Sequence, residues 1–357
     1  VARRACVLLA NEESACIAAQ VMATQGLRPQ RLQGRIEGDA PHVARKLLTK
    51  TGARVTSTLD ARVQRFAFET LQRHLVELNG RNVEDGALVV LDNASGEVLA
   101  WVGSSGDLSR ANEVDGVTAP RQAGSTLKPF LYGLAIEQRM LTAASVLDDS
   151  PLAVTTPTGL YVPQNYDHDF KGLVSLRQAL ASSLNVPAVR TLTLLGYEPF
   201  YRRLKALGFE TLTRDADHYG YSLALGGADV TLLQLTNAYR TLANGGRAGA
   251  TTLLPSTDRI DAVQVMAATS AYIVGDVLAD SAARALTFGL ASPLATRYPA
   301  SVKTGTSTDM RDNWAIGYTS RFTVGVWVGN FSGEPMHDVS GVTGAAPVWR
   351  EVMDFLH

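Results

Sequence analysis

The chain has 357 residues, of which 46% are hydrophobic and 19% charged, and its formal net charge is -1. This length and apolar content allow one large domain or two, with a sizeable core. A net charge near zero gives no reason to expect nucleic acid or an anionic membrane surface as a partner. The sequence contains no run of eighteen apolar residues, so it does not predict a transmembrane helix.

Residues 1 to 56 differ in composition from the rest of the chain. They carry more basic than acidic side chains, two apolar runs of helical character, and a polar break at 29–41 that contains Gly and Pro. We expect the tail of a preceding domain plus a linker, with an ordinary surface extension as the alternative. The chain opens on Val1 without a signal-peptide pattern, from which we expect a fragment of a longer protein.

The only cysteines, Cys6 and Cys16, lie in this first segment. They fit neither a disulfide scaffold nor a zinc site. The sequence is equally compatible with one disulfide bridge between them and with two unpaired thiols.

After this segment, the elements follow in a clear order. A helix begins near Thr58, with Thr58 as its N-cap and Asp60 in its first turn. Two β-rich runs, 86–92 and 97–103, flank a short polar connection and predict a hairpin. Apolar periodicity then predicts helices, strands and a closing helix. The helices are 127–139, 176–184, 186–195, 198–207, 231–243 and 268–279; the strands are 300–306, 314–318 and 322–328; the closing helix is 347–356.

This order predicts an α+β fold. If the hairpin and the later strands form one mostly antiparallel sheet, the chain brings residues about 200 apart into register, and helices flank the sheet. The long helical middle then forms a lobe beside the sheet, and a cleft between lobe and sheet is the natural pocket.

Three short motifs fall at this boundary. The first is Ser125-Thr126-Leu127-Lys128, followed by Pro129. Positions i and i+3 of a helix share a face, so the Lys128 amine can reach the Ser125 hydroxyl and accept its proton. Proline is tolerated in the first helical turn, which predicts that Ser125 lies at a helix N-terminus, where free N–H groups suit an oxyanion.

The other two motifs supply polar partners. Ser183 and Asn185 can relay a proton between Lys128, Lys303 and a leaving group. The segment Lys303-Thr304-Gly305-Thr306 lies on a predicted strand, where Lys303 and a threonine hydroxyl can hold a carboxylate. Gly305 is unusual in a strand unless another backbone comes close, and a bound peptide would be such a backbone. An N–H near Thr306 could join that of Ser125 in an oxyanion hole.

Together the motifs resemble those of the penicillin-interacting serine acyltransferases. Four segments resemble the transpeptidase domain of class A penicillin-binding proteins, and the first and last are most similar to the 1C type. The segments are 124–136, 165–189, 225–246 and 303–328. The resemblance covers about residues 54–357 and implies the fold shared with serine β-lactamases.

The resemblance also implies a function. Ser125 would be the acylated nucleophile and Lys128 its base; Ser183, Asn185 and Lys303 would complete the catalytic set; and Thr304, Gly305 and Thr306 would bind substrate. The partners implied are peptidoglycan stem peptides and β-lactams. Residues 1–53 would be the link from a missing N-terminal glycosyltransferase whose anchor holds the family at the periplasmic face of the bacterial inner membrane, the fragment itself being soluble.

Further residues complete the expected site. Tyr166 is a candidate cleft wall, and Arg311 or Asp312 a candidate for the cleft mouth. We expect no cofactor and no metal, because His168, His218 and His337 lack metal-ligand spacing.

Three other functions use the same motifs. A β-lactamase needs an efficient deacylating base, but Glu198 and Glu210, the only glutamates between the second and third motifs, do not sit in a segment of the class A β-lactamase type. A D,D-carboxypeptidase hydrolyses the same acyl-enzyme, and nothing local excludes it. A β-lactam receptor domain carries the same motifs, although the class A-like segments fit a synthase better.

Overall fold

The computed structural model describes residues 38–156, 159–255, 261–289 and 292–357. Residues His42–His357 form one compact unit, and Val1–Pro41 belong to a separate one. Cys6 and Cys16 lie outside the described residues, so the question of a bridge between them stays open. The assignment of residues 1–53 to the tail of a missing domain remains a prediction.

Runs of helices and runs of strands follow one another along the chain. The helices, with short 3-10 helices written η, are α3 (Pro41–Leu47), α4 (Ala61–Glu77), η1 (Gly106–Leu108), η2 (Gly124–Leu127), α5 (Lys128–Glu137), α6 (Leu176–Ala181), α7 (Asn185–Leu195), α8 (Tyr197–Ala206), α9 (Ala216–Tyr219), η3 (Gly220–Leu225), α10 (Leu232–Ala243), α11 (Ala268–Ala279), α12 (Ser281–Phe288), η4 (Thr308–Met310) and α13 (Ala345–Leu356). The strands are β1 (Asp85–Asp92), β2 (Val98–Val102), β3 (Arg121–Gln122), β4 (Val146–Asp149), β5 (Val154–Thr156), β6 (Gly159–Tyr161), β7 (Gly172–Ser175), β8 (Asp229–Val230), β9 (Arg247–Ala248), β10 (Val263–Gln264), β11 (Ser301–Thr306), β12 (Asp312–Tyr318) and β13 (Phe322–Gly329).

A five-stranded antiparallel sheet in the order β11-β12-β13-β1-β2 forms the centre of the unit. Strands β1 and β13 pair directly, with Leu88 opposite Val326. The expectation that the early hairpin and the late strands join in one sheet is therefore confirmed. Strand β11, which carries the third motif, is an edge strand of this sheet.

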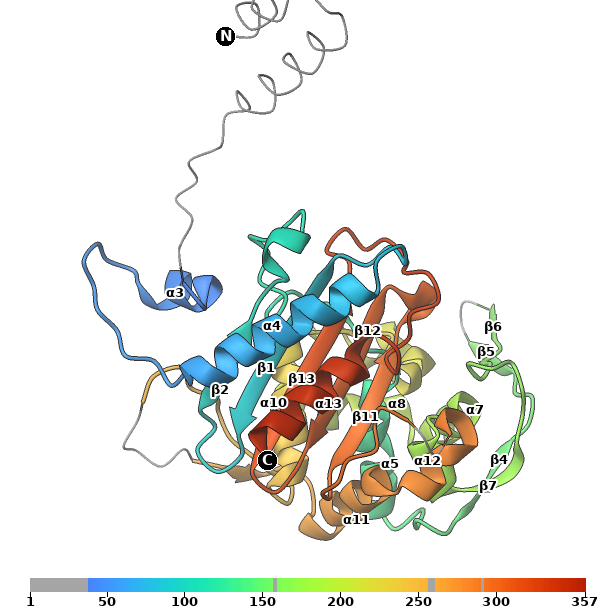
Figure 1. The fold of residues 1–357 in the computed structure, drawn as a ribbon. Helices are drawn as coiled ribbons and strands as arrows, with labels where there is room; N and C mark the ends of the chain where they lie inside the picture. The colour runs from blue at the N-terminus through green and yellow to red at the C-terminus, as the bar shows by residue number, and fades with distance from the viewer. Residues whose placement is uncertain (1–37, 157–158, 256–260, 290–291) are drawn as a thin grey trace, which may run out of the picture. The chain divides into compact units, whose positions relative to one another are not determined.

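Helices cover both faces of the sheet. Figure 1 shows α4 and α13 crossing one face, while α10 lies behind β13. The α10 side is so close that a Cβ on Gly325 would meet the hydroxyl of Thr236. Because both faces are buried, β1 and β13 are continuous apolar runs rather than alternating ones. The predicted α+β class, with helices flanking an antiparallel sheet, is confirmed.

The first predicted helix starts later than expected. Its N-cap is Asp60, whose carboxylate accepts hydrogen bonds from the N–H groups of Arg62 and Val63 at 2.8 and 3.3 Å. The prediction of Thr58 as the cap is wrong, because the Thr58 hydroxyl donates instead to the carbonyl of Val98 in the hairpin.

The helical lobe contains two α-helices that the sequence pattern did not predict, the short α9 and the longer α12. Helix α12 begins at Ser281, where Asp280 caps it by accepting from the N–H of Ala283. The lobe also contains the predicted helix at 176–184, but this helix ends at Ala181 and the chain then turns sharply. Within the described residues, no helix combines the length and apolarity that crossing a bilayer requires.

Candidate active site

Ser125 lies in η2, directly before α5, and so close to the edge strand that two glycines are required. Gly124 has φ +56°, and a Cβ there would lie 2.7 Å from the carbonyl oxygen of Thr306. On the strand side, a Cβ on Gly305 would lie 2.7 Å from Cγ2 of Thr126 and 3.0 Å from the carbonyl oxygen of Ala123. Both contacts press the serine turn against the end of β11.

These contacts give a reason for Gly305 within the chain itself. A backbone approaches it, as predicted, and that backbone is residue Ala123. The need for glycine is therefore fixed by the fold itself. Pairing of a bound peptide with this strand stays a prediction.

Lys128 is completely buried at the start of α5. Its side-chain nitrogen donates to the carbonyl oxygens of Ser183 and Leu184, at 2.7 and 3.1 Å, and to Oδ1 of Asn185 at 2.6 Å. None of these acceptors is the Ser125 hydroxyl to which the helical spacing pointed. A buried amine needs acceptors, and the turn after α6 provides three.

That turn has an unusual backbone. Ser183 has φ +60°, in the left-handed region that residues other than glycine rarely adopt. Such conformations cost about 1–3 kcal/mol and persist where surrounding contacts impose them. Here the Ser183 carbonyl accepts from Lys128, and its hydroxyl accepts from Lys303. The neighbouring Ser182 hydroxyl donates to the carbonyl of Ala283, which ties the turn to α12.

Lys303 projects from β11 and is almost fully buried. Its nitrogen donates to the Ser183 hydroxyl and to the carbonyl oxygen of Thr304, each at 2.7 Å. Burial, and then the nearby guanidinium of Arg284, lower the pKa of Lys303 to about 7. Arg284 is itself buried in α12 and donates to the carbonyl of Leu278.

The charge of Lys303 acts on the neighbouring buried amine of Lys128. Burial, followed by the charge of Lys303, lowers the pKa of Lys128 well below its usual range, while the carboxylate of Asp149 acts in the opposite direction. A lysine whose pKa is lowered in this way loses its proton more easily, and the neutral amine can accept one.

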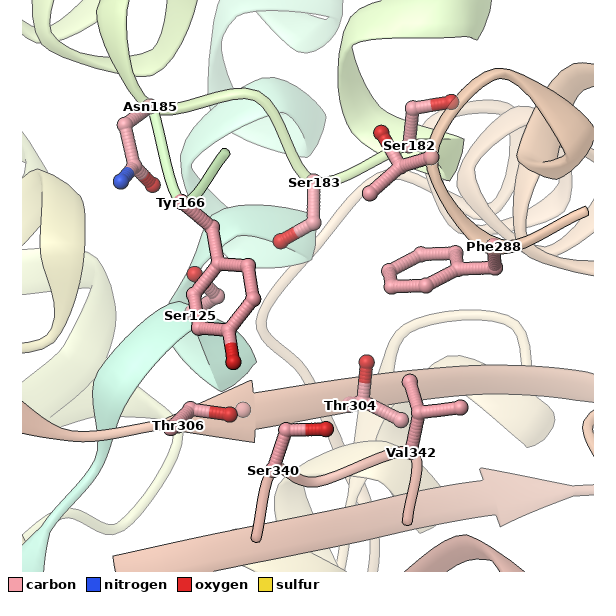
Figure 2. Close-up of a pocket in the computed structure, with 12 residues that line it drawn as sticks. Ser125, Tyr166, Ser182, Ser183, Asn185, Phe288, Thr304, Thr306, Ser340 and Val342 are labelled. Carbon is pink, nitrogen blue, oxygen red and sulfur yellow. The ribbon is translucent and has the colours of Figure 1, made fainter. Parts of the chain in front are cut away.

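Two cavities meet at Ser125. Both are lined by Ser125, Tyr166, Asn185 and Thr306. Figure 2 shows Ser125 and Ser183 facing Thr304 and Thr306 of β11 across the first cavity, with Phe288 of α12 at its far end. The structure thus brings together the residues of all three motifs. Tyr166 lines the cleft as predicted and is 58% exposed.

The cleft mouth differs from the prediction. Asp312 is buried and accepts from the indole of Trp327 and the hydroxyl of Ser307, each at 3.0 Å; burial raises the pKa of this carboxyl group. Arg311 lines neither cavity and pairs with Asp309 at 3.4 Å. The predicted mouth role of Asp312 is therefore wrong, because its strand places it inside the sheet.

Sequence reasoning missed two buried side chains, Asp149 and Asn165. Asn165 accepts a hydrogen bond from the backbone N–H of Asn185 at 2.8 Å and donates to both oxygens of Asp149. The sequence analysis also missed Thr287 and Phe288, because helix α12 was not predicted. No motif spacing marks these residues, since each acts across a long sequence separation. Among the residues that the structure describes, no group of three His, Cys, Asp or Glu side chains is arranged to hold a metal ion.

The comparisons with known proteins agree with the motifs. The family model described as "Penicillin binding protein transpeptidase domain" matches residues 86–354. Penicillin-binding protein 1C of Escherichia coli K12 is 36% identical over 320 residues, which cover 89% of this chain and 40% of that protein. Penicillin-binding protein 1A of Neisseria meningitidis is 32% identical over 289 residues, 76% of this chain and 35% of the relative. The chain thus spans well under half the length of these relatives.

Solved structures show the same fold. The penicillin-binding protein PonA1 of Mycobacterium tuberculosis, in complex with penicillin V, aligns with a TM-score of 0.72 at 23% identity, over 87% of each chain. A peptidoglycan glycosyltransferase structure from Burkholderia ambifaria aligns with a TM-score of 0.67 at 22% identity, over 84% of this chain and 98% of the other.

Proposed function

The chain belongs to the transpeptidase domain family of class A penicillin-binding proteins, and from this premise we propose that it is a serine D,D-transpeptidase acting through a Ser125 acyl-enzyme. Its substrates are peptidoglycan stem peptides that end in D-Ala-D-Ala, and β-lactams acylate the same serine. The observation that supports this most directly is the Ser183 turn beside Ser125, which binds both lysines at once.

Acylation begins with removal of the Ser125 proton by a neutral Lys128. The serine oxygen then attacks the carbonyl of the penultimate D-alanine. The backbone N–H groups of Ser125 and Thr306 hold the oxyanion that forms. As the amide bond breaks, the proton passes from Lys128 through the Ser183 hydroxyl to the departing amine of the terminal D-alanine. An amine from a second stem peptide later attacks the ester, which forms the cross-link and restores Ser125.

Lys303 holds the substrate carboxylate in this scheme. The Thr304 and Thr306 side chains face the cavity beside it (Figure 2). The Thr306 hydroxyl already accepts from the N–H of Gly341 at 3.0 Å, so its own proton is left to donate to an anion. Asn185 has its amide nitrogen directed to the carbonyl of Gln164, and its remaining N–H can bond to a substrate amide.

The domain organisation and location of the full-length protein are proposed from its relatives. Residues 1–53 link to an N-terminal glycosyltransferase with a membrane anchor, and this domain works at the periplasmic face of the inner membrane. A D,D-carboxypeptidase and a β-lactam receptor domain remain the alternatives. The carboxypeptidase differs only in the acceptor, which is water instead of an amine.

Intact-protein mass spectrometry after incubation with a penicillin tests the acyl-enzyme. We expect one adduct per chain in the wild type and none in Ser125→Ala. A matched control is Ser320→Ala, an exposed serine in the turn between β12 and β13, which should be labelled like the wild type. Absence of an adduct in folded wild-type protein would overturn the proposal, and labelling of Ser125→Ala would move the nucleophile elsewhere.

A further inference from the structure

Asp149 is a fully buried carboxylate that the proposed reaction does not use. It ends strand β4, and its oxygens accept from the amide nitrogen of Asn165 at 2.9 and 2.8 Å. One oxygen also accepts from the backbone N–H of Lys171 at 2.9 Å. The carboxylate therefore fixes the loop that contains Asn165 without a salt bridge to a side chain of that loop.

Asn165 caps a helix from outside it. Helix α7 has Leu184 at its N-cap position, which provides no capping side chain. The side-chain oxygen of Asn165 accepts instead from the first two N–H groups of the helix, those of Asn185 at 2.8 Å and Val186 at 3.5 Å. Unsatisfied N–H groups at a helix start are stabilised by such an acceptor and by nearby negative charge.

The same loop holds the side chain of Asn185. Its amide nitrogen donates to the carbonyl oxygen of Gln164 at 2.7 Å, and its oxygen accepts from Lys128 at 2.6 Å. Backbone and side chain of Asn185 are thus both fixed by residues 164 and 165. A continuous chain of hydrogen bonds runs from Asp149 through Asn165 and Asn185 to Lys128.

We propose that Asp149 and Asn165 are positioning residues for acyl transfer, which fix Asn185 and, through it, the side-chain nitrogen of Lys128 relative to Ser125. The inference rests on the proposed function, because it takes Lys128 as the base. Misplacement of a catalytic group by about 1 Å can cost roughly 100-fold in rate.

The charges around Asp149 make its influence measurable. From α5 it is faced by Lys128 and by Tyr132, whose buried hydroxyl stays protonated because its pKa is raised by burial. The ammonium of Lys171 is bound by Asp167 and Asp169 at 2.8 and 2.9 Å. From α7, Arg190 pairs with Asp148 at 3.1 Å. Lys128 is therefore the titrating cation that responds to the charge of Asp149.

The test measures the rate of acylation of the whole 357-residue chain by a fluorescent penicillin across pH. Asn165→Ala should slow acylation about 100-fold yet still reach one label per chain. Its effect should nearly vanish in an Asn185→Ala background, because Asn165 acts through Asn185. Asp149→Asn removes a negative charge and so lowers the pKa of Lys128; the rising limb of the pH–rate profile should move to lower pH.

Thr231→Ala is the matched control. Thr231 caps α10 by accepting from the N–H of Gln234 at 3.1 Å, and this cap lines neither cavity at Ser125. Its loss should lower the melting temperature by an amount similar to that of Asn165→Ala while leaving the acylation rate and the pH profile unchanged.

The outcomes separate the two proposals. If the wild type is not labelled, the proposed function fails. If the wild type is labelled but Asn165→Ala behaves like Thr231→Ala, or the profile of Asp149→Asn does not move, the positioning role is overturned. Should Asp149→Asn not fold, the pair Asn165→Ala and Asn185→Ala decides alone: additive effects on the rate contradict the inference.

Discussion

Lys303 donates a 2.7 Å hydrogen bond to the hydroxyl of Ser183, which lies 120 residues earlier in the chain. The same serine accepts from Lys128 through its backbone carbonyl oxygen. One residue therefore contacts both buried amines through different atoms. The two contacts can be separated by mutation, since only the hydroxyl depends on the side chain.

Ser183→Ala and Ser183→Gly should both slow penicillin acylation by roughly 100-fold or more, because both remove the proton relay and keep the backbone contact to Lys128. They should differ in stability. Glycine adopts φ +60° without strain, so Ser183→Gly should be more stable than Ser183→Ala by about 1 kcal/mol. Acylation kinetics and denaturant unfolding measure the two effects. A wild-type rate in either variant would remove Ser183 from the relay.

Lys128→Ala and Asn185→Ala should have different effects. Loss of Lys128 removes the base, and with it the cation that forms beside the oxyanion when Lys128 takes the Ser125 proton, so acylation should fall by roughly 1,000-fold or more. Loss of Asn185 removes one of three acceptors of Lys128 and a substrate contact, so acylation should persist at a reduced rate while peptide turnover suffers more. Stopped-flow labelling and a peptide release assay make the comparison. Equal, small effects on acylation would contradict both roles.

Lys303 should lower the stability of the protein in a pH-dependent way. Its pKa is about 7 in the folded state and 10.5 ordinarily, so folding disfavours its charged form. This destabilisation is fully present below about pH 7 and disappears as the pH rises towards 10.5. Lys303→Met should therefore gain more in melting temperature over the wild type at pH 6 than at pH 9. An equal difference at both pH values would show that the charge is not destabilising.

The same variant should lose function, because both penicillin and a D-Ala-D-Ala peptide present a carboxylate for Lys303 to bind. Acylation by each should weaken. An acyl donor without a carboxylate serves as the control and should be affected much less.

Local sequence pattern was sufficient to predict the strands of the five-stranded sheet and most of the longer helices, but not the short strands of the two-stranded sheets. Strands β11, β12 and β13 lie within a residue or two of their predicted ranges, because buried strands and helices carry strong apolar patterns. The motif residues also lie together, as their place at the boundary between sheet and lobe predicted. Residues of all three motifs line one cavity, and the two motif lysines contact Ser183 beside it.

Contacts between distant segments were not predictable in this way. Asn165 caps a helix that begins 20 residues later in the chain, and Asp149, 16 residues before Asn165, binds its side chain. No periodic sequence pattern indicates either contact. The sequence motifs named Ser183 and Asn185 as partners of Lys128. They did not reveal that backbone carbonyls of the turn, those of Ser183 and Leu184, accept hydrogen bonds from its amine, because helical spacing identifies only neighbours on one helix. The cap at Asp60 was missed because Thr58 and Asp60 are both good capping residues and only the hairpin contact of Thr58 distinguishes them.

Gly305→Ala should push the serine turn away from the edge strand. The new methyl group would lie 2.7 Å from Cγ2 of Thr126, so we expect a loss of about 1–3 kcal/mol in stability and a clear loss of acylation rate. Adding Thr126→Ser should restore part of both, because serine lacks that methyl group and keeps the hydroxyl bond to Ala123. Thermal melts and labelling rates of the three variants test this. No rescue by Thr126→Ser would place the clash elsewhere.

The fate of the acyl-enzyme depends on whether a base can activate water. The two glutamates between the second and third motifs line neither cavity, and Glu198 pairs with Arg202 at 2.8 Å on α8. Asp309 is the one carboxylate among the lining residues of these two cavities, and it pairs with Arg311. The Ser125 ester should therefore resist hydrolysis and persist until an amine attacks it.

Nitrocefin hydrolysis, followed over minutes to hours, tests this expectation. We expect one stoichiometric burst and then slow turnover, and Asp309→Asn should leave that slow rate unchanged. With a D-Ala-D-Ala donor, turnover should stay slow until an amino acceptor is added, and it should then rise and yield a cross-linked product. Water alone as an efficient acceptor for the peptide would favour the carboxypeptidase. Sustained rapid turnover of nitrocefin would mean that a deacylating base exists, and the transpeptidase would have to give way to a β-lactamase.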